Sequence, residues 1–171
     1  MQKVKPSIRL LESADIPQIA RAFEKLGWHK PASQYEHYLM EQTFDVRDVY
    51  VAFVEDQFAG YLTICWNSTY PPFQEAEIPE IVDFNVLPEF RRQGIGTALM
   101  DKAEGEIAKV SRVSGIGVGM DTDYGAAQRL YVLRGYVPDG RGLHHKDHFP
   151  KHGEQITVDD DLALFFMKEL K

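Results

Sequence analysis

Apolar and polar positions in the first half of the chain follow two different periods. Residues 16–26 carry apolar side chains at helical spacing, which predicts a helix that ends at Gly27. A second helix is expected from Pro31, because proline suits the first turn of a helix. Residues 48–54 and 58–66 are almost continuously apolar, β-branched or aromatic. The short polar segment between them predicts a β-hairpin.

Strands and helices alternate in the second half of the chain. Residues 67–77 contain two consecutive prolines and are expected to form a loop. The alternation after this loop indicates an α/β fold with parallel pairing in the middle of its sheet. The elements expected there are strands at 80–87 and 115–120, helices at 94–109 and 125–134, and further strands at 136–137 and 162–167.

Composition places the chain among ordinary globular domains. Its 171 residues are 44% hydrophobic and 26% charged, which predicts one domain over residues 1–171. The net charge of −7 disfavours nucleic-acid binding; it suits cationic small molecules or simply aids solubility. The single Cys65 excludes an internal disulfide, and the chain start lacks the apolar core of a signal peptide. No apolar run is long enough to span a membrane, so we expect a cytoplasmic protein without a membrane partner.

The turn after strand 80–87 carries the clearest candidate chemistry. Arg91 and Arg92 precede Gly94 and Gly96, which open a helix. Free backbone N–H groups at a helix start attract anions, and glycines let a phosphate approach them closely. The pattern therefore predicts a diphosphate-binding turn.

Two common nucleotide motifs do not fit this turn. A Walker loop needs a Gly-Lys-Ser/Thr sequence that is missing here, and Leu99 stands where a Rossmann turn has its third small residue. Gly115, Gly117 and Gly119 alternate within a strand, which indicates close packing rather than a second nucleotide loop.

Two segments carry a family resemblance. Arg91-Arg92-Gln93-Gly94-Ile95-Gly96 resembles the Arg/Gln-x-x-Gly-x-Gly/Ala signature with which GNAT-superfamily N-acetyltransferases hold the pyrophosphate of acetyl-CoA. Residues 127–136 resemble the family's helix that ends in a tyrosine, three residues, a glycine and an aromatic residue. The resemblance implies a single α/β domain with a mixed, centrally splayed β-sheet flanked by helices.

The resemblance also implies a set of residues that bind acetyl-CoA, the co-substrate. Many family members carry an asparagine that contacts the pantetheine arm where this chain has Tyr124. The expected set is Phe84, Asn85, Val86, Arg91, Arg92, Gln93, Gly94, Ile95, Gly96, Thr97 and Tyr124.

Acetyl transfer to an amine requires a base for the ammonium proton and an acid for the leaving thiolate. The resemblance implies Tyr131 as the acid and a strand carboxylate, Glu80 or Asp83, as the base. Three residues apart, these carboxylates face opposite sides of a regular strand, so only one faces the cleft unless a bulge intervenes. Cys65 offers an acetyl-accepting thiol, although a lone cysteine in an apolar strand is typical of a buried small hydrophobe.

Aromatic residues near acidic ones suggest an acceptor pocket. Trp28, Tyr70 and Phe73 are candidates for binding an amine or guanidine with an apolar body, and the alternative is that these rings anchor loops. The histidines at 144–152 match no zinc spacing, so no metal is predicted and an acceptor-side loop is expected.

The expected function is transfer of an acetyl group from acetyl-CoA to a primary amine of a small, cationic molecule by direct attack in a ternary complex. A non-catalytic acyl-CoA sensor and a protein lysine or N-terminal acetyltransferase remain as alternatives. Homodimers are common in the family, so a homodimer is a possible assembly.

Overall fold

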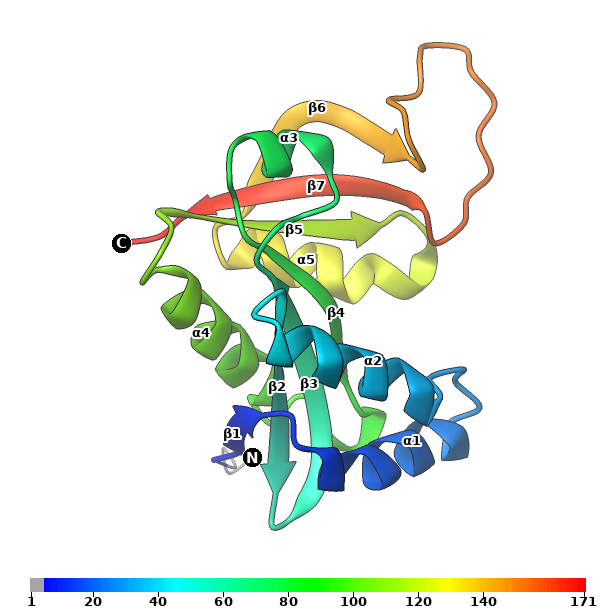
Figure 1. Cartoon of the computed structure of the whole chain (residues 1–171). Coiled ribbons are helices and arrows are strands. Elements are labelled where there is room, and N and C mark those ends of the chain that lie inside the picture. The colour runs from blue at the N-terminus through cyan, green and yellow to red at the C-terminus, as the bar shows by residue number, and fades with distance from the viewer. Residues whose placement is uncertain (1–4) are drawn as a thin grey trace.

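The computed structural model describes residues 5–171. The prediction about the start of the chain, that it lacks a signal-peptide core, falls partly on residues 1–4, which lie outside the described part. Seven strands form one sheet in the order β1-β2-β3-β4-β5-β7-β6 (Figure 1). The strands are β1 (Ser7–Leu10), β2 (Arg47–Val54), β3 (Gln57–Cys65), β4 (Glu80–Val86), β5 (Val113–Gly119), β6 (Val137–His145) and β7 (Leu162–Glu169). The helices are α1 (Ile16–Lys25), α2 (Ala32–Thr43), α3 (Pro71–Glu75), α4 (Ile95–Ile107) and α5 (Gly125–Leu133), with 3-10 turns η1 (Ser13–Asp15), η2 (Pro88–Phe90) and η3 (Thr122–Tyr124).

The strand period of two sends alternate β2 side chains into two different cores. Val49 and Val51 pack in the core that includes residues of α1 and α2. Tyr50 and Ala52 point the other way, into the core formed with α4 and α5. The predicted hairpin, the two helices predicted in the second half of the chain and the mixed α/β sheet are confirmed.

The sheet opens at its centre, between β4 and β5. These two strands run parallel but pair only at Glu80 with Gly115 and at Ile81 with Ile116. Beyond these pairs β4 continues with the half of the sheet made by β1–β3, whereas β5 continues with β7 and β6 (Figure 1). Among residues 5–171, no helix combines the length and the apolar character needed to cross a membrane.

The glycines of β5 allow aromatic rings to lie directly on the strand. A Cβ at Gly115 would lie 2.3 Å from the ring of Phe73, and one at Gly119 would lie 2.5 Å from the ring of Tyr124. A Cβ at Gly117 would lie 2.8 Å from the ring of Phe165. The prediction that these glycines serve close packing is therefore confirmed.

Two segments expected as loops contain regular structure. Residues 67–77 include the short helix α3, which begins with two prolines. Proline has no backbone N–H group, and the first positions of a helix do not use theirs in intrahelical hydrogen bonds, so both prolines fit there. The histidine segment, from which an acceptor-side loop was expected, begins within a strand that runs as far as His145. Gly140 and Gly142 have positive φ values of 85° and 77° and lie within an irregularity of the β6–β7 pairing. These glycines are typical of a loop in the sequence, but in the structure they mark a bend within strand β6.

Candidate active site

A cavity of about 530 Å3 lies where β4 and β5 diverge. It brings together the predicted carboxylates, the predicted acid Tyr131 and several predicted cofactor residues. The polar and aromatic side chains in its lining are those of His29, Lys30, Glu80, Asp83, Phe84, Asn85, Tyr124, Tyr131, Asp160 and Phe165.

A β-bulge places both candidate carboxylates in this one cavity. Thr63 of β3 pairs with Val82, but Tyr61 pairs with Asn85, so β4 holds one extra residue in this stretch. Asp83 lies within it and has a left-handed φ of 55°. The regular alternation that would separate Glu80 from Asp83 is thereby broken, and both line the cavity.

Glu80 is a buried carboxylate with few partners. It is 9% exposed and accepts a hydrogen bond from the hydroxyl of Ser68. Burial raises the pKa of Glu80 above its usual range, while the Ser68 hydrogen bond and the charge of Arg47 oppose the rise. A carboxylate with a raised pKa is a stronger base near neutral pH.

Asp83, by contrast, is surrounded by donors from four parts of the chain. The Tyr61 hydroxyl donates to it from β3. The remaining donors are Lys30 Nζ at 2.7 Å, Asn85 Nδ2 at 2.9 Å, Gln34 Nε2 at 3.0 Å and the Tyr38 hydroxyl at 3.1 Å. A carboxylate has about four lone-pair positions, so this set occupies the acceptor capacity of Asp83. Its geometry suits a structural anchor better than a proton acceptor.

Tyr131 faces the cavity from α5 and is 5% exposed. Burial, with a smaller contribution from nearby Tyr124, raises the pKa of the Tyr131 hydroxyl far above its usual value. The hydroxyl therefore keeps its proton at neutral pH and is available as a donor.

The glycine turn has the geometry of an anion-binding site. Gly94, with a φ of 88°, caps α4, and no side chain caps the first turn of this helix. Arg91 Nε donates to the carbonyl oxygen of Val86 at 3.1 Å, and Gln93 Nε2 donates to that of Glu89 at 2.9 Å. Both side chains are thus turned toward preceding backbone, and the backbone N–H groups at the start of α4 are left without a capping side chain.

Gly96 also has a packing role that the sequence did not reveal. A Cβ there would lie 3.2 Å from Phe84 Cζ and 3.6 Å from Val86 Cγ2. The first turn of α4 therefore lies close against β4, which brings the helix start next to the open edge of that strand.

The three residues predicted to bind the acceptor lie elsewhere. Tyr70 and Phe73 are buried with Phe165, and the Tyr70 ring stacks on that of Phe165 at 3.6 Å between centroids. Trp28 stacks on Phe23 and lines a hollow at the junction of α1 and α2, which shares His29 and Lys30 with the central cavity. Such packing is typical of rings that anchor loops, which is the alternative interpretation. Next to Tyr70 and Phe73, Phe165 and Ala163 line the central cavity.

The histidine segment is fixed by carboxylates and aromatic rings. His145 Nε2 lies 3.0 Å from Asp159 Oδ1, and His148 Nε2 lies 2.7 Å from Glu154 Oε1. The ring of His144 packs among aromatic rings, and burial lowers its pKa. Within residues 5–171, no three or more His, Cys, Asp or Glu side chains are grouped so as to hold a metal ion.

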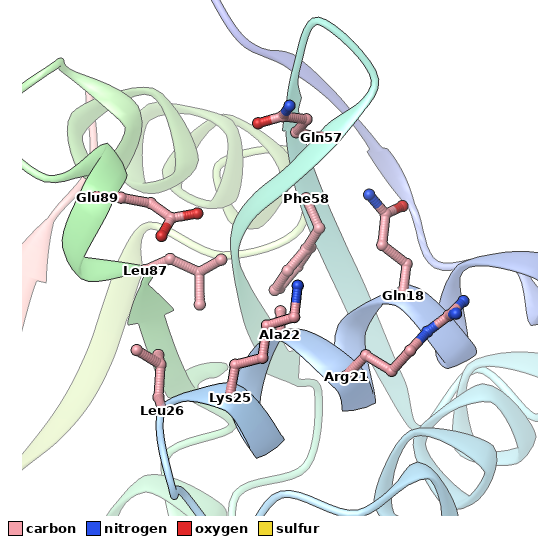
Figure 2. Close-up of a pocket in the computed structure, with 9 residues that line it drawn as sticks. All are labelled: Gln18, Arg21, Ala22, Lys25, Leu26, Gln57, Phe58, Leu87 and Glu89. Carbon is pink, nitrogen blue, oxygen red and sulfur yellow. The ribbon is translucent and has the colours of Figure 1, made fainter.

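A further hollow, of about 410 Å3, lies between α1, the start of β3 and the turn after β4 (Figure 2). Phe58 and Leu87 are buried in its floor, whereas Arg21, Lys25 and Glu89 are exposed at its rim. The buried Glu80 and Tyr131 belong instead to the cavity between β4 and β5, which is therefore the candidate active site.

Comparison with known proteins places the chain in a family. The Acetyltransferase (GNAT) family pattern matches residues 15–136, so the chain belongs to this family. An uncharacterized N-acetyltransferase of Archaeoglobus fulgidus is 35% identical over 89 residues, which are 52% of this chain and 58% of that relative. The chain thus matches little more than half the length of that curated relative.

Solved structures share the fold at low sequence identity. The ribosomal-protein-alanine N-acetyltransferase of Brucella melitensis superposes with a TM-score of 0.69 at 20% identity, covering 96% of this chain and 99% of that one. The yncA protein of Salmonella typhimurium, solved with its cofactor acetyl-CoA, gives 0.67 at 17% identity and covers 97% and 94%. The predicted family and the predicted fold are confirmed.

Sequence reasoning missed several residues that line or shape the cavity. Lys30, Tyr61, Asp160 and Phe165 were not singled out. Tyr61 belongs to an evenly apolar strand, and its contact with Asp83 spans 22 positions of the chain. The contact between Tyr61 and Asp83 depends on the extra residue in β4. The alternation of apolar and polar positions along the sequence does not reveal that residue.

Proposed function

We propose that this protein transfers the acetyl group of acetyl-CoA to the primary amine of a small, cationic molecule, by direct attack in a ternary complex within one domain. The observation that carries the proposal is the opening between β4 and β5. It puts a buried carboxylate, Glu80, and a protonated tyrosine, Tyr131, into one cavity beside an anion-binding helix start.

The residues present fit the proposed co-substrate. The start of α4 offers uncapped backbone N–H groups for a diphosphate, with exposed Arg91 and Arg92 beside it. From Phe84 to Val86, β4 has no strand partner on its β5 side among the described residues, so its backbone is open to an extended amide-bearing chain. The related fold of yncA with acetyl-CoA supports the same assignment.

Each proton has a group to receive or supply it. When bound, acetyl-CoA supplies an activated acyl carbon, to which the amine forms a C–N bond as the C–S bond breaks. We assign Glu80 as the base that takes the ammonium proton, directly or through water, because its pKa is raised and its carboxylate has few partners. We assign Tyr131 as the donor that gives a proton to the departing sulfur, and the second proton lost by the nitrogen as the amide forms restores the Tyr131 hydroxyl.

The state of Cys65 supports direct attack over transfer through a thioester on the protein. Burial raises the pKa of this thiol, and its sulfur lies 3.2 Å from the carbonyl oxygen of Asn67. A buried thiol that keeps its proton is a poor nucleophile.

Release of free CoA thiol from acetyl-CoA would test the function against polyamines, aminoglycosides, amino acids, arylalkylamines, a lysine peptide and a peptide with an N-terminal alanine. Release with a small amine supports the proposal, and release only with a peptide would establish a protein acetyltransferase instead. Binding of acetyl-CoA without release across the panel would favour a sensor. The control is Gly94→Val, which should abolish acetyl-CoA binding because a side chain at φ 88° is strained and blocks the N–H groups.

A further inference from the structure

The central cavity already contains a primary ammonium group that belongs to the protein. Lys30, in the connection between α1 and α2, lines the cavity together with Asp83. Its Nζ lies 2.7 Å from Asp83 Oδ1 and donates to the Tyr61 hydroxyl at 3.1 Å. The two charged side chains are only 18% and 16% exposed.

The surroundings of Lys30 Nζ have the composition of an ammonium-binding site. Besides the carboxylate and the hydroxyl, the ammonium lies 5.8 Å from the centre of the Phe23 ring and 5.7 Å from that of Tyr61. Both distances fall within the range of cation–π attraction. A carboxylate flanked by aromatic rings could also bind a cationic group of the acceptor. Here the ammonium group of Lys30 occupies that position.

We propose that Lys30 is a specificity-determining residue: its ammonium fills the position that a second cationic group of an acceptor would take, so that the enzyme selects monocationic amines over diamines and polyamines. This inference rests on the proposed function, because it assumes that the acceptor enters this cavity. The reactive amine would approach Glu80, while Lys30 neutralises Asp83 and repels a further positive charge.

The Lys30→Met variant tests this role directly, with n-butylamine and 1,4-diaminobutane as probes that differ by one ammonium group. The variant removes the charge and keeps the aliphatic length. Asp83 Oδ1 then keeps the hydrogen bond from Asn85 Nδ2 but loses that from Lys30, so this oxygen can accept one from the second ammonium of the diamine. We expect the diamine to bind about tenfold more tightly, the order expected for one hydrogen bond between charged groups, while n-butylamine changes little. The matched control is Lys25→Met, which makes the same change of net charge at an exposed position of α1.

Two further variants keep the test decisive. In Lys30→Gln the positive charge is lost but the amide can still donate to Asp83. This variant replaces Lys30→Met if that one fails to fold, with a gain for the diamine in the same direction but smaller. In the double variant Lys30→Met with Asp83→Asn, the gain for the diamine should disappear. Equal changes for both amines in the folded single variant, or a gain that survives removal of the Asp83 charge, would overturn the proposal.

Binding should be measured by calorimetry with CoA present, alongside turnover of acetyl-CoA. If Lys30→Met binds the diamine more tightly but neither amine is acetylated, the ammonium site is supported and the proposed function is contradicted. If the wild type acetylates both amines with equal kcat/KM and these values are unchanged in Lys30→Met, the proposed role of Lys30 is contradicted, whereas the proposed function is supported.

Discussion

Glu80 combines burial with a hydrogen bond from Ser68, and these have opposite effects on its pKa, with burial the larger. Replacing it in Glu80→Gln keeps an oxygen for Ser68 but removes the proposed base, so we expect kcat to fall about 100-fold or more. Because the pKa of Glu80 is raised, wild-type kcat/KM should fall on the acid side with an apparent pKa above the usual range of a glutamate. The residual activity of the variant should not show this fall. Steady-state kinetics from pH 5 to 9 would measure both.

The stability of Glu80→Gln provides the control for that experiment. A carboxyl group whose pKa is raised in the folded state contributes stability below its unfolded pKa and loses it as pH rises through the folded pKa. At neutral pH the buried carboxylate is therefore a cost, and the variant should unfold at no lower urea concentration than the wild type. A large loss of stability would show that Glu80 is a structural residue.

Tyr131 offers a second prediction at the residue scale. Tyr131→Phe removes one hydroxyl and leaves the ring, so acetyl-CoA should bind as before while kcat falls about 10- to 100-fold, toward the lower end of acid–base effects. Calorimetry would give the affinity and thiol release the rate. Unchanged turnover would remove Tyr131 from the mechanism, since a hydroxyl that supplies the proton to the sulfur cannot be lost without effect.

At the scale of elements, β5 depends on its glycines to hold aromatic rings against the strand. Gly115→Val would force a side chain into the space of the Phe73 ring, which is itself buried, and should cost about 1–3 kcal/mol of unfolding free energy. Gly105→Ala is the matched control, because this exposed glycine of α4 has nothing within 4 Å of its missing Cβ. It should gain about 1 kcal/mol from helix propensity. Urea unfolding of both variants would test this contrast.

The sequence was informative about elements whose signal is local. The β2–β3 hairpin and helix α4 follow from periodicity and turn residues, and the glycine turn follows from glycines and arginines at a helix start, residue types that suit anion binding. It was uninformative where distant segments meet. The contact of Lys30 with Asp83 spans 53 positions and depends on a bulge, and the burial of Tyr70 depends on β7. Such contacts are fixed by packing, which no local pattern encodes.

At the scale of the whole molecule, two halves of one sheet are joined by only two residue pairs between β4 and β5. A ligand whose extended arm lies between them would add contacts to both halves, whereas the unfolded chain offers none. Acetyl-CoA at about 100 times its dissociation constant should therefore stabilise the protein by about 2.7 kcal/mol. For a chain of this size that corresponds to a rise in Tm of about 5 to 10 °C.

The location of this stabilisation distinguishes binding in the opening from binding at the glycine turn alone. Hydrogen exchange should slow at residues 82–86 of β4 and 117–119 of β5, which face each other across the opening without pairing. CoA, which carries the same arm, should protect both stretches, whereas 3′,5′-ADP should protect only the start of α4. If CoA protects the start of α4 and leaves both strands unchanged, the arm does not lie between the strands, and the acyl carbon would not reach the cavity that holds Glu80 and Tyr131.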